Sequence, residues 1–228
     1  MTELRQRYLD AVRGLLGPQL HDQLSPSMLA GASVAVLPVD GAGISMSDPR
    51  LRVPLGWSSE DAAATERLQT TLGEGPCLTA AAQESALVAD ADAIARRWPV
   101  YQVELNQQTP FCSVASVPLR VPGGDVFGAL NLYAYRPDLS AVLAQDETRE
   151  VAEPVAAMLI GMLASPGKDR PDDGLPLRLD QESAVARSEV WMAVGMLIAN
   201  SALTDMTALA LLRGFAFSQE ITLDDAAH

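Results

Sequence analysis

The sequence is poor in the residues that usually carry chemistry. Among 228 residues there are two cysteines, a single lysine, Lys168, and only two histidines, His21 and His228. Two cysteines do not make a disulfide framework, and two histidines are too few for a zinc site or a haem ligand set. A phosphate-binding loop with its lysine, a Cys-x-x-Cys pair and a Gly-x-Ser-x-Gly motif are all missing. The sequence therefore predicts no catalytic residues, no metal site and no resident cofactor.

Positive charge and long apolar runs are also scarce. Sixteen basic residues face 29 acidic ones, which gives a formal charge of −13. The molecule as a whole therefore lacks the electropositive footprint that phosphate backbones require, and DNA is not expected as a partner. The longest uncharged run, residues 23–39, is too short and too polar to span a bilayer. Without a secretory signal at its start, the chain is expected to be soluble and cytoplasmic, with no membrane partner.

The remaining composition is that of a folded protein, with 48% hydrophobic and 20% charged residues. Apolar periodicity and turn residues divide residues 1–164 into helices and strands. Asp40–Gly43 has turn chemistry, and Pro154 predicts a kink or a late start in the last helix. The pattern predicts an α+β domain built on an antiparallel sheet. Helices are expected over 1–24, 26–37, 60–72, 76–82, 98–105 and 141–164, and strands over 43–47, 51–56, 86–89, 112–121 and 126–135.

The composition changes after this domain. Residues 165–179 are polar and rich in proline and glycine, which predicts a linker. Residues 180–228 read as helical throughout: one helix over 183–199, a second capped by Thr204, and a third that starts at Thr222 and is cut short at His228. The residues of the second helix expected to face inward are Ala208, Leu211, Leu212 and Phe215.

Several short blocks of residues 25–164 resemble the GAF domain, a sensory module. The resemblance implies a sheet-based domain that senses a small molecule or passes on a signal, and it leaves the ligand unidentified. The blocks are Pro38–Gly43, Leu72–Cys77, Arg97–Pro99, Pro118–Leu119 and Gly128–Tyr133.

Residues 180–228 resemble the ANTAR domain, a three-helix RNA-binding module of bacterial antiterminators. Actinobacterial regulators join it to a GAF domain in this order. The resemblance implies a homodimer that binds a hairpin RNA leader and prevents terminator formation. It rests on Val190, Ala193, Gly195, Met196 and Leu197, on Ala208, Leu212, Arg213 and Ala216, and on Leu223–Ala227.

The C-terminal segment departs from the ANTAR pattern in its charge. Val194 stands where many members of the family have lysine. From Asp180 onward, Arg187 and Arg213 are the two basic residues against seven acidic ones, a net charge of −5. Because phosphate binding relies on basic side chains, either the RNA surface continues beyond His228 or this member does not bind RNA.

The candidate site residues fall into two groups, each with a plainer alternative. Glu74, Cys77 and Trp98 are candidates to line a GAF pocket, although a turn-capping glutamate, an inert buried thiol and a packing tryptophan are the more ordinary roles. Arg187, Arg213 and Phe217 are candidates to contact RNA, the arginines through phosphates and the phenylalanine by stacking on a base. Solvated or salt-bridged arginines and a core phenylalanine are the alternatives.

Three functions follow from these observations. The leading hypothesis is a signal-responsive antitermination regulator, in which helix 141–164 and the linker pass the signal to the C-terminal helices. The second is a GAF sensor whose helical tail serves only dimerisation or protein docking. The third is a GAF-fold reductase that uses Cys77 and Cys112; the unmatched contexts of the two cysteines make it the least favoured, and the chain is expected not to be an enzyme.

Overall fold

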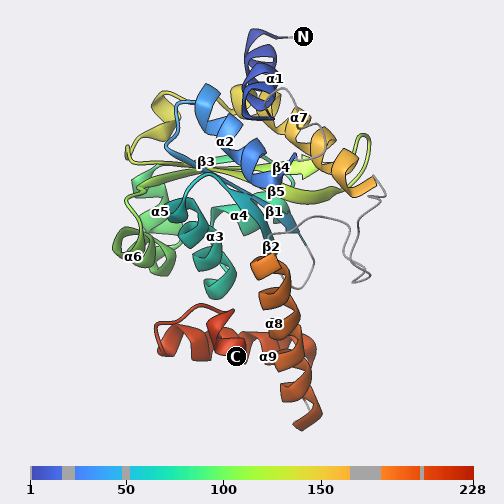
Figure 1. Ribbon diagram of the computed structural model, residues 1–228. Coiled ribbons are helices and arrows are strands. Elements are labelled where there is room, and N and C mark those ends of the chain that lie inside the picture. Colours follow the sequence, from blue (N-terminus) through green and yellow to red (C-terminus); the bar gives the residue numbers. More distant parts are fainter. Residues whose placement is uncertain (1, 17–23, 48–51, 165–180, 201–202) are drawn as a thin grey trace.

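A computed structural model describes residues 2–16, 24–47, 52–164, 181–200 and 203–228 (Figure 1). Its centre is a five-stranded antiparallel sheet in the order β2-β1-β5-β4-β3. The α+β class and the antiparallel sheet expected from the sequence are thus confirmed. The strands are β1 (Gly41–Ser47), β2 (Arg52–Trp57), β3 (Leu87–Ala89), β4 (Ser113–Arg120) and β5 (Val126–Ala134).

The first strand begins earlier than expected. The prediction of a turn over Asp40–Gly43 is wrong at the glycines, because they belong to β1 and Gly41 already pairs with Tyr133 of β5. The Asp40 carboxylate accepts the backbone N–H of Tyr135 at 2.8 Å and anchors the strand start to the end of β5. Tertiary pairing here outweighs the local preference of glycine for turns.

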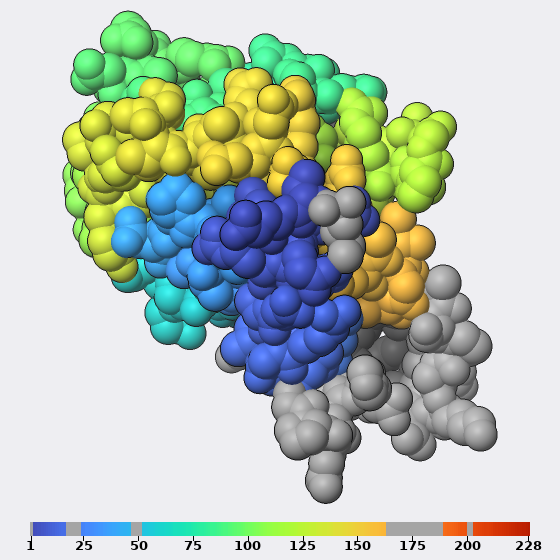
Figure 2. Space-filling model, turned by 90° about the horizontal axis from the view of Figure 1, so that it is seen from above, coloured from blue at the N-terminus to red at the C-terminus, as the bar shows by residue number. Residues whose placement is uncertain are grey.

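One face of the sheet is covered by α1 (Glu3–Leu16), α2 (Pro26–Val36) and α7 (Gln145–Ala164) (Figure 1). Seen from that side, α1 lies over α2 and beside α7 (Figure 2). The start of α2 matches the sequence prediction, because the Ser25 hydroxyl accepts the N–H of Met28 and Pro26 is the first helical residue. Helix α7 begins at Gln145 and runs through Pro154.

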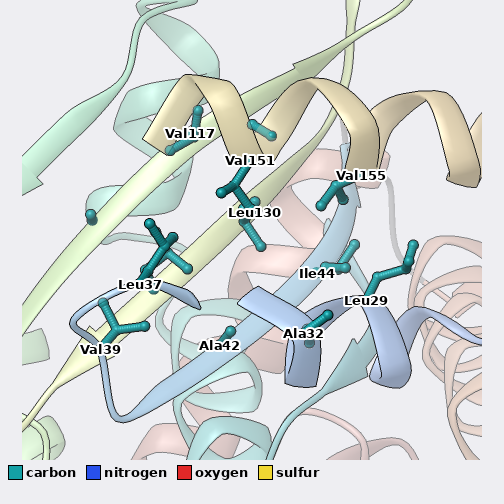
Figure 3. Close-up of a cluster of buried hydrophobic side chains, with 14 of the residues drawn as sticks. Leu29, Ala32, Leu37, Val39, Ala42, Ile44, Val117, Leu130, Val151 and Val155 are labelled. Carbon is teal, nitrogen blue, oxygen red and sulfur yellow. The ribbon is translucent and has the colours of Figure 1, made fainter. Parts of the chain in front are cut away.

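The main core lies between these helices and the sheet (Figure 3). Its side chains come from alternate positions of the strands, which place every second residue on this face. Ile44, Val117 and Leu130 meet Leu29 of α2 and Val151 and Val155 of α7 in the close-up.

The opposite face is covered by α3 (Glu60–Leu72), α4 (Pro76–Ala82), α5 (Ala91–Arg97) and α6 (Pro99–Gln108). Helix α3 has the expected bounds: Ser59 caps its start, and Gly73, with φ 68°, ends it in the left-handed conformation. Helix α5, which is only seven residues long, was not predicted from the sequence. A second core lies here, with Leu68, Ile94, Trp98, Leu105, Phe111 and Val114 among its buried side chains.

The C-terminal segment forms α8 (Gln181–Asn200), α9 (Asp205–Ser218) and a 3₁₀ turn, η3 (Asp225–Ala227). Thr204 caps α9 as predicted. Thr222 also caps, by accepting the N–H of Asp225, but the expected third helix is this short 3₁₀ turn. The segment has its own core of Val190, Val194, Ala208, Leu209, Leu212 and Leu223.

One expectation for this segment, the inward-facing side of α9, is corrected, and another, the linker, is not tested. Leu211 and Phe215 were expected to face inward, yet each is 53% exposed, because the buried side of α9 is centred on Ala208 and Leu212. The linker predicted over 165–179 lies outside the described residues.

Within the described part of the chain, no helix is long and apolar enough to cross a membrane, and no group of three or more histidine, cysteine or acidic side chains is placed to hold a metal ion.

Candidate functional site

An ion pair is buried between the sheet and α3. Arg52 comes from β2 and Glu66 from α3, and their side chains are 3% and 0% exposed. The Arg52 guanidinium donates through Nη2 to Glu66 Oε2 and through Nε to Ser45 Oγ, the latter at 2.8 Å. Charged side chains are almost never fully buried unless they are paired, so the burial of each of these two charges depends on the other.

The second oxygen of Glu66 is also satisfied. Glu66 Oε1 accepts the Asn131 side-chain amide at 2.8 Å and the Tyr133 hydroxyl at 2.6 Å. Burial, and then the neighbouring Glu66, raise the pKa of Tyr133 well above its ordinary value, so the hydroxyl remains a donor. The carboxylate thus accepts hydrogen bonds from three side chains on two strands.

The sheet surface below Glu66 is shaped to receive it. Gly43, Asn131 and Ser116 are paired across β1, β5 and β4, and the Ser116 hydroxyl donates to Asn131 Oδ1 at 2.9 Å. A Cβ atom on Gly43 would lie 2.2 Å from Glu66 Oε1. Only glycine at this position leaves room for the carboxylate against the strand.

Cys77, at the start of α4, belongs to the same cluster. Its Sγ lies 3.9 Å from Ser45 Oγ, and its backbone N–H donates to Gln69 Oε1 at 3.0 Å. Burial raises the pKa of the Cys77 thiol more than the facing Arg52 lowers it. A thiol that stays protonated is a poor nucleophile, which supports the inert reading of Cys77.

Two buried polar groups of this cluster have no hydrogen-bond partner among the described residues, Gln69 Nε2 and the Tyr101 hydroxyl. Burial, followed by Glu66, raises the pKa of Tyr101, so its hydroxyl is a donor. An unsatisfied buried donor costs about 1–3 kcal/mol. Gln69 Nε2 and the Tyr101 hydroxyl are thus buried donors without an acceptor among the described residues.

The three residues predicted to line a pocket are not brought together as a set. Cys77 joins the buried cluster, whereas Trp98 packs in the apolar core with the Arg97 guanidinium 4.4 Å from its ring centroid. Glu74 follows α3 and has one buried oxygen, Oε1, without a partner among the described residues. Cys112 has different contacts from Cys77: its Sγ lies 3.9 Å from the carbonyl oxygen of Pro110.

The residues predicted to contact RNA lie on the C-terminal helices. Arg213 Nε donates to the backbone carbonyl of Thr70, at the end of α3, at 3.2 Å. Phe217, one helical turn further along α9, is 47% exposed. Arg187 lies in α8, and its side chain is outside the described residues.

A groove of about 630 Å³ lies on the opposite face of the sheet, between α7 and the β4–β5 turn. Its floor is apolar, with Val117, Pro118 and Ala152, and its rim carries ion pairs. Arg120 with Glu84 and Arg5 with Glu153 are both solvent-exposed pairs. Exposed pairs of this kind contribute little energy, and the groove lacks a buried charged group.

Arg52, Glu66 and Asn131 were not predicted from the sequence as site residues. Arg52 and Glu66 are on different elements, and no local pattern pairs them. A signal was present in β5, where Asn131 and Tyr133 alternate with the apolar Leu130 and Leu132. Polar side chains on one face of a central strand indicate a buried polar cluster.

Comparison with known proteins agrees with this architecture. The family model for the GAF domain matches residues 21–159, so the chain belongs to the GAF domain family. No curated protein sequence matches the chain.

Solved structures resemble the chain at low sequence identity. The GAF domain of a phosphoenolpyruvate-protein phosphotransferase from Coxiella burnetii is 16% identical, with a TM-score of 0.47, over 69% of this chain and 95% of that one. The reduced form of fRMsr from Staphylococcus aureus is 13% identical, with a TM-score of 0.47, over 70% and 96%. A GAF sensor protein from Burkholderia vietnamiensis is 16% identical, with a TM-score of 0.43, over 71% and 90%.

Proposed function

We propose that this protein is a cytoplasmic, signal-responsive regulator in which the GAF domain controls an ANTAR-like C-terminal module that pairs with a second copy and binds a hairpin RNA leader in antitermination. The GAF domain is a signal-sensing domain. The buried cluster around Glu66 is the place in it that offers donors to a small polar ligand.

The observation that carries the proposal is the apolar exposed surface of the C-terminal helices. From Val190 to Ala199 helix α8 has no charged residue on any face, and Met192 and Met196 are each 58% exposed. Leu211 and Phe215 of α9 add to the exposed apolar surface. A helix that is apolar all round normally packs on both sides. A second copy of the same module supplies that second side, as closed two-fold pairing does in most oligomers.

Small residues in the same stretch support close helix pairing. Gly195 lies on α8 with open space where a side chain would be, and Ala199 is one turn further on the exposed side. Helix axes approach closely where small residues meet. The pair of modules would then present two copies of α9, one for each hairpin of a two-hairpin RNA.

RNA contact is assigned to Arg213 and Phe217. They are four residues apart on α9 and so are neighbours on its surface. A guanidinium beside an exposed aromatic ring offers one phosphate contact and one stacking platform, the combination that single-stranded loops of RNA hairpins bind.

A second function, a sensor whose tail only dimerises or docks another protein, is favoured by a specific observation. Arg213 already donates to Thr70, and the segment carries a net charge of −5. With only two basic residues in this segment, the module would gain little of the counterion release that drives RNA binding. In this function the exposed apolar surface serves protein contact alone.

A titration of labelled two-hairpin RNA, followed by fluorescence anisotropy at two salt concentrations, separates the two functions. RNA binding predicts saturable anisotropy that weakens steeply with salt, and a loss of affinity of roughly tenfold in Phe217→Ala. Val103→Ala, at an exposed apolar position of α6, is the matched control. Absence of binding by the wild-type chain at low salt would leave the docking function.

A further inference from the structure

The C-terminal module contacts the GAF domain at the last turn of α3, and α8 also contacts β2. Hydrogen bonds of Arg213 and Leu223 join the module to α3. Arg213 Nε donates to the carbonyl of Thr70 at 3.2 Å, and the backbone N–H of Leu223 donates to Thr71 Oγ1 at 3.1 Å. Figure 1 shows α8 and α9 on this side of the sheet, below α3.

The chemistry of this contact suits a helix end. The last carbonyl oxygens of a helix have no partner within the helix and carry partial negative charge. The Arg213 guanidinium supplies both the donor and the positive charge, so a residue of the C-terminal module completes the end of a GAF-domain helix.

Gly73 makes the contact possible. It ends α3 with φ 68°, and a Cβ atom there would lie 2.8 Å from Arg213 Nη1 and 3.0 Å from its Cζ. The absence of a side chain at Gly73 thus serves two purposes, the turn of the backbone and the seat of the guanidinium.

The contact lies one turn from the buried ion pair. The Thr70 hydroxyl donates to the carbonyl of Glu66 at 3.0 Å, and Arg52 Nη1 lies 3.4 Å from the same carbonyl. A rearrangement at the Glu66 carboxylate therefore has a short path to Thr70, through the backbone of α3 itself.

We propose that the Arg213–Thr70 contact is a latch that holds the C-terminal module docked on the GAF domain and withholds Arg213 from phosphate. The Arg213 Nε–H that donates to Thr70 is not available to an RNA phosphate while the module is docked. Undocking then makes the module competent for its partner, and α3 is the element through which the GAF domain controls it. The RNA half of this proposal rests on the proposed function, whereas the docking half does not.

Gly73→Ala is the variant that tests the latch. The added methyl group displaces Arg213 and leaves its charge intact. Gly123→Ala is the matched control: Gly123 has φ 70° and nothing within 4 Å, so the alanine there meets the same backbone strain without a clash. Arg213→Gln removes the guanidinium without adding bulk and provides a second undocking variant.

Docking is read by hydrogen–deuterium exchange of the peptides that contain Thr71 and Leu223, in the protein alone. The latch predicts faster exchange at Leu223 in both Gly73→Ala and Arg213→Gln, and wild-type rates in Gly123→Ala. Unchanged exchange at Leu223 in both undocking variants, with circular dichroism showing that they are folded, overturns the latch.

RNA binding is read separately with the labelled two-hairpin RNA. If docking reduces the competent fraction, Gly73→Ala binds roughly five- to tenfold more tightly than wild type, whereas Arg213→Gln binds more weakly. Equal RNA affinity of Gly73→Ala and wild type overturns the withholding of Arg213. If exchange is faster in the undocking variants but neither they nor the wild type bind RNA, the docking latch is supported and the RNA function is rejected.

Discussion

The carboxylate of Glu66 lies directly against Gly43, so close that only glycine fits at this position of β1. Because Gly43 has no side chain, the charged Glu66 of α3 can be buried against the sheet. Around this point the domain gathers a guanidinium, an amide and a phenol, all donating to one carboxylate.

Gly43→Ala is expected to destabilise the protein by about 1–3 kcal/mol, because the methyl group overpacks the seat of Glu66. The measurement is the free energy of unfolding from urea denaturation. Gly161→Ala, in α7 with nothing within 4 Å, is the control and is expected to stabilise by up to about 1 kcal/mol. Equal stability of Gly43→Ala and wild type would mean that Glu66 does not occupy this seat.

Arg52→Met is expected to cost about 3–5 kcal/mol of unfolding free energy, because it leaves Glu66 buried without its cation. Arg149→Ala breaks the exposed pair with Asp146 and is expected to change stability by less than about 1 kcal/mol. The double variant Arg52→Met, Glu66→Met is expected to recover part of the loss, since no charge then remains buried. A single variant as stable as wild type would contradict the buried pair.

Alkaline pH is expected to unfold the protein cooperatively through its buried tyrosines. Burial raises the pKa values of Tyr8, Tyr101 and Tyr133 above the ordinary 10.0. A raised native-state pKa contributes stability that is present below pH 10.0 and is lost as the pH rises above it.

The measurement is phenolate absorbance together with circular dichroism during an alkaline titration. Ionisation of the buried tyrosines and loss of helical signal are expected at the same pH. Tyr135→Phe, which leaves the three buried tyrosines in place, is expected to unfold at the wild-type midpoint. Ionisation of all tyrosines in a protein that keeps its helical signal would refute their burial.

Native thiol reactivity is expected to come from Cys112 alone. Cys77 is 1% exposed and burial raises its thiol pKa, whereas Cys112 is partly exposed. Alkylation with iodoacetamide, read by mass spectrometry, is expected to label Cys112 in the folded protein and both cysteines in urea. Cys112→Ser is then unlabelled when folded. Rapid native labelling of Cys77 would revive the reductase hypothesis.

Much of the secondary structure follows from local chemistry in the sequence. Ser25 with Pro26, Gly73 and Thr204 mark helix ends that the structure confirms. The parts that could not be predicted depend on contacts between distant residues. Gly41 was assigned to a turn because nothing local announces its pairing with Tyr133.

The candidate site was predicted only at Cys77. Arg52 and Glu66 are 14 residues apart on a strand and a helix, and charged residues are by default expected at the surface. The exposure of Phe215 was missed for a related reason. Helical spacing places it near the apolar face of α9, and only the position of α8 decides which side of α9 is covered.

Self-association of the C-terminal module is the central claim, and sedimentation equilibrium tests it most directly. Wild type is expected to dimerise with rising concentration. Met192→Glu, which places a charge on the exposed apolar side of α8, is expected to be monomeric over the same range. Val103→Glu, an equally conspicuous exposed apolar position on α6, is the control and is expected to dimerise like wild type. A wild-type protein that remains monomeric, or a dimer that Met192→Glu leaves unchanged, would contradict the account.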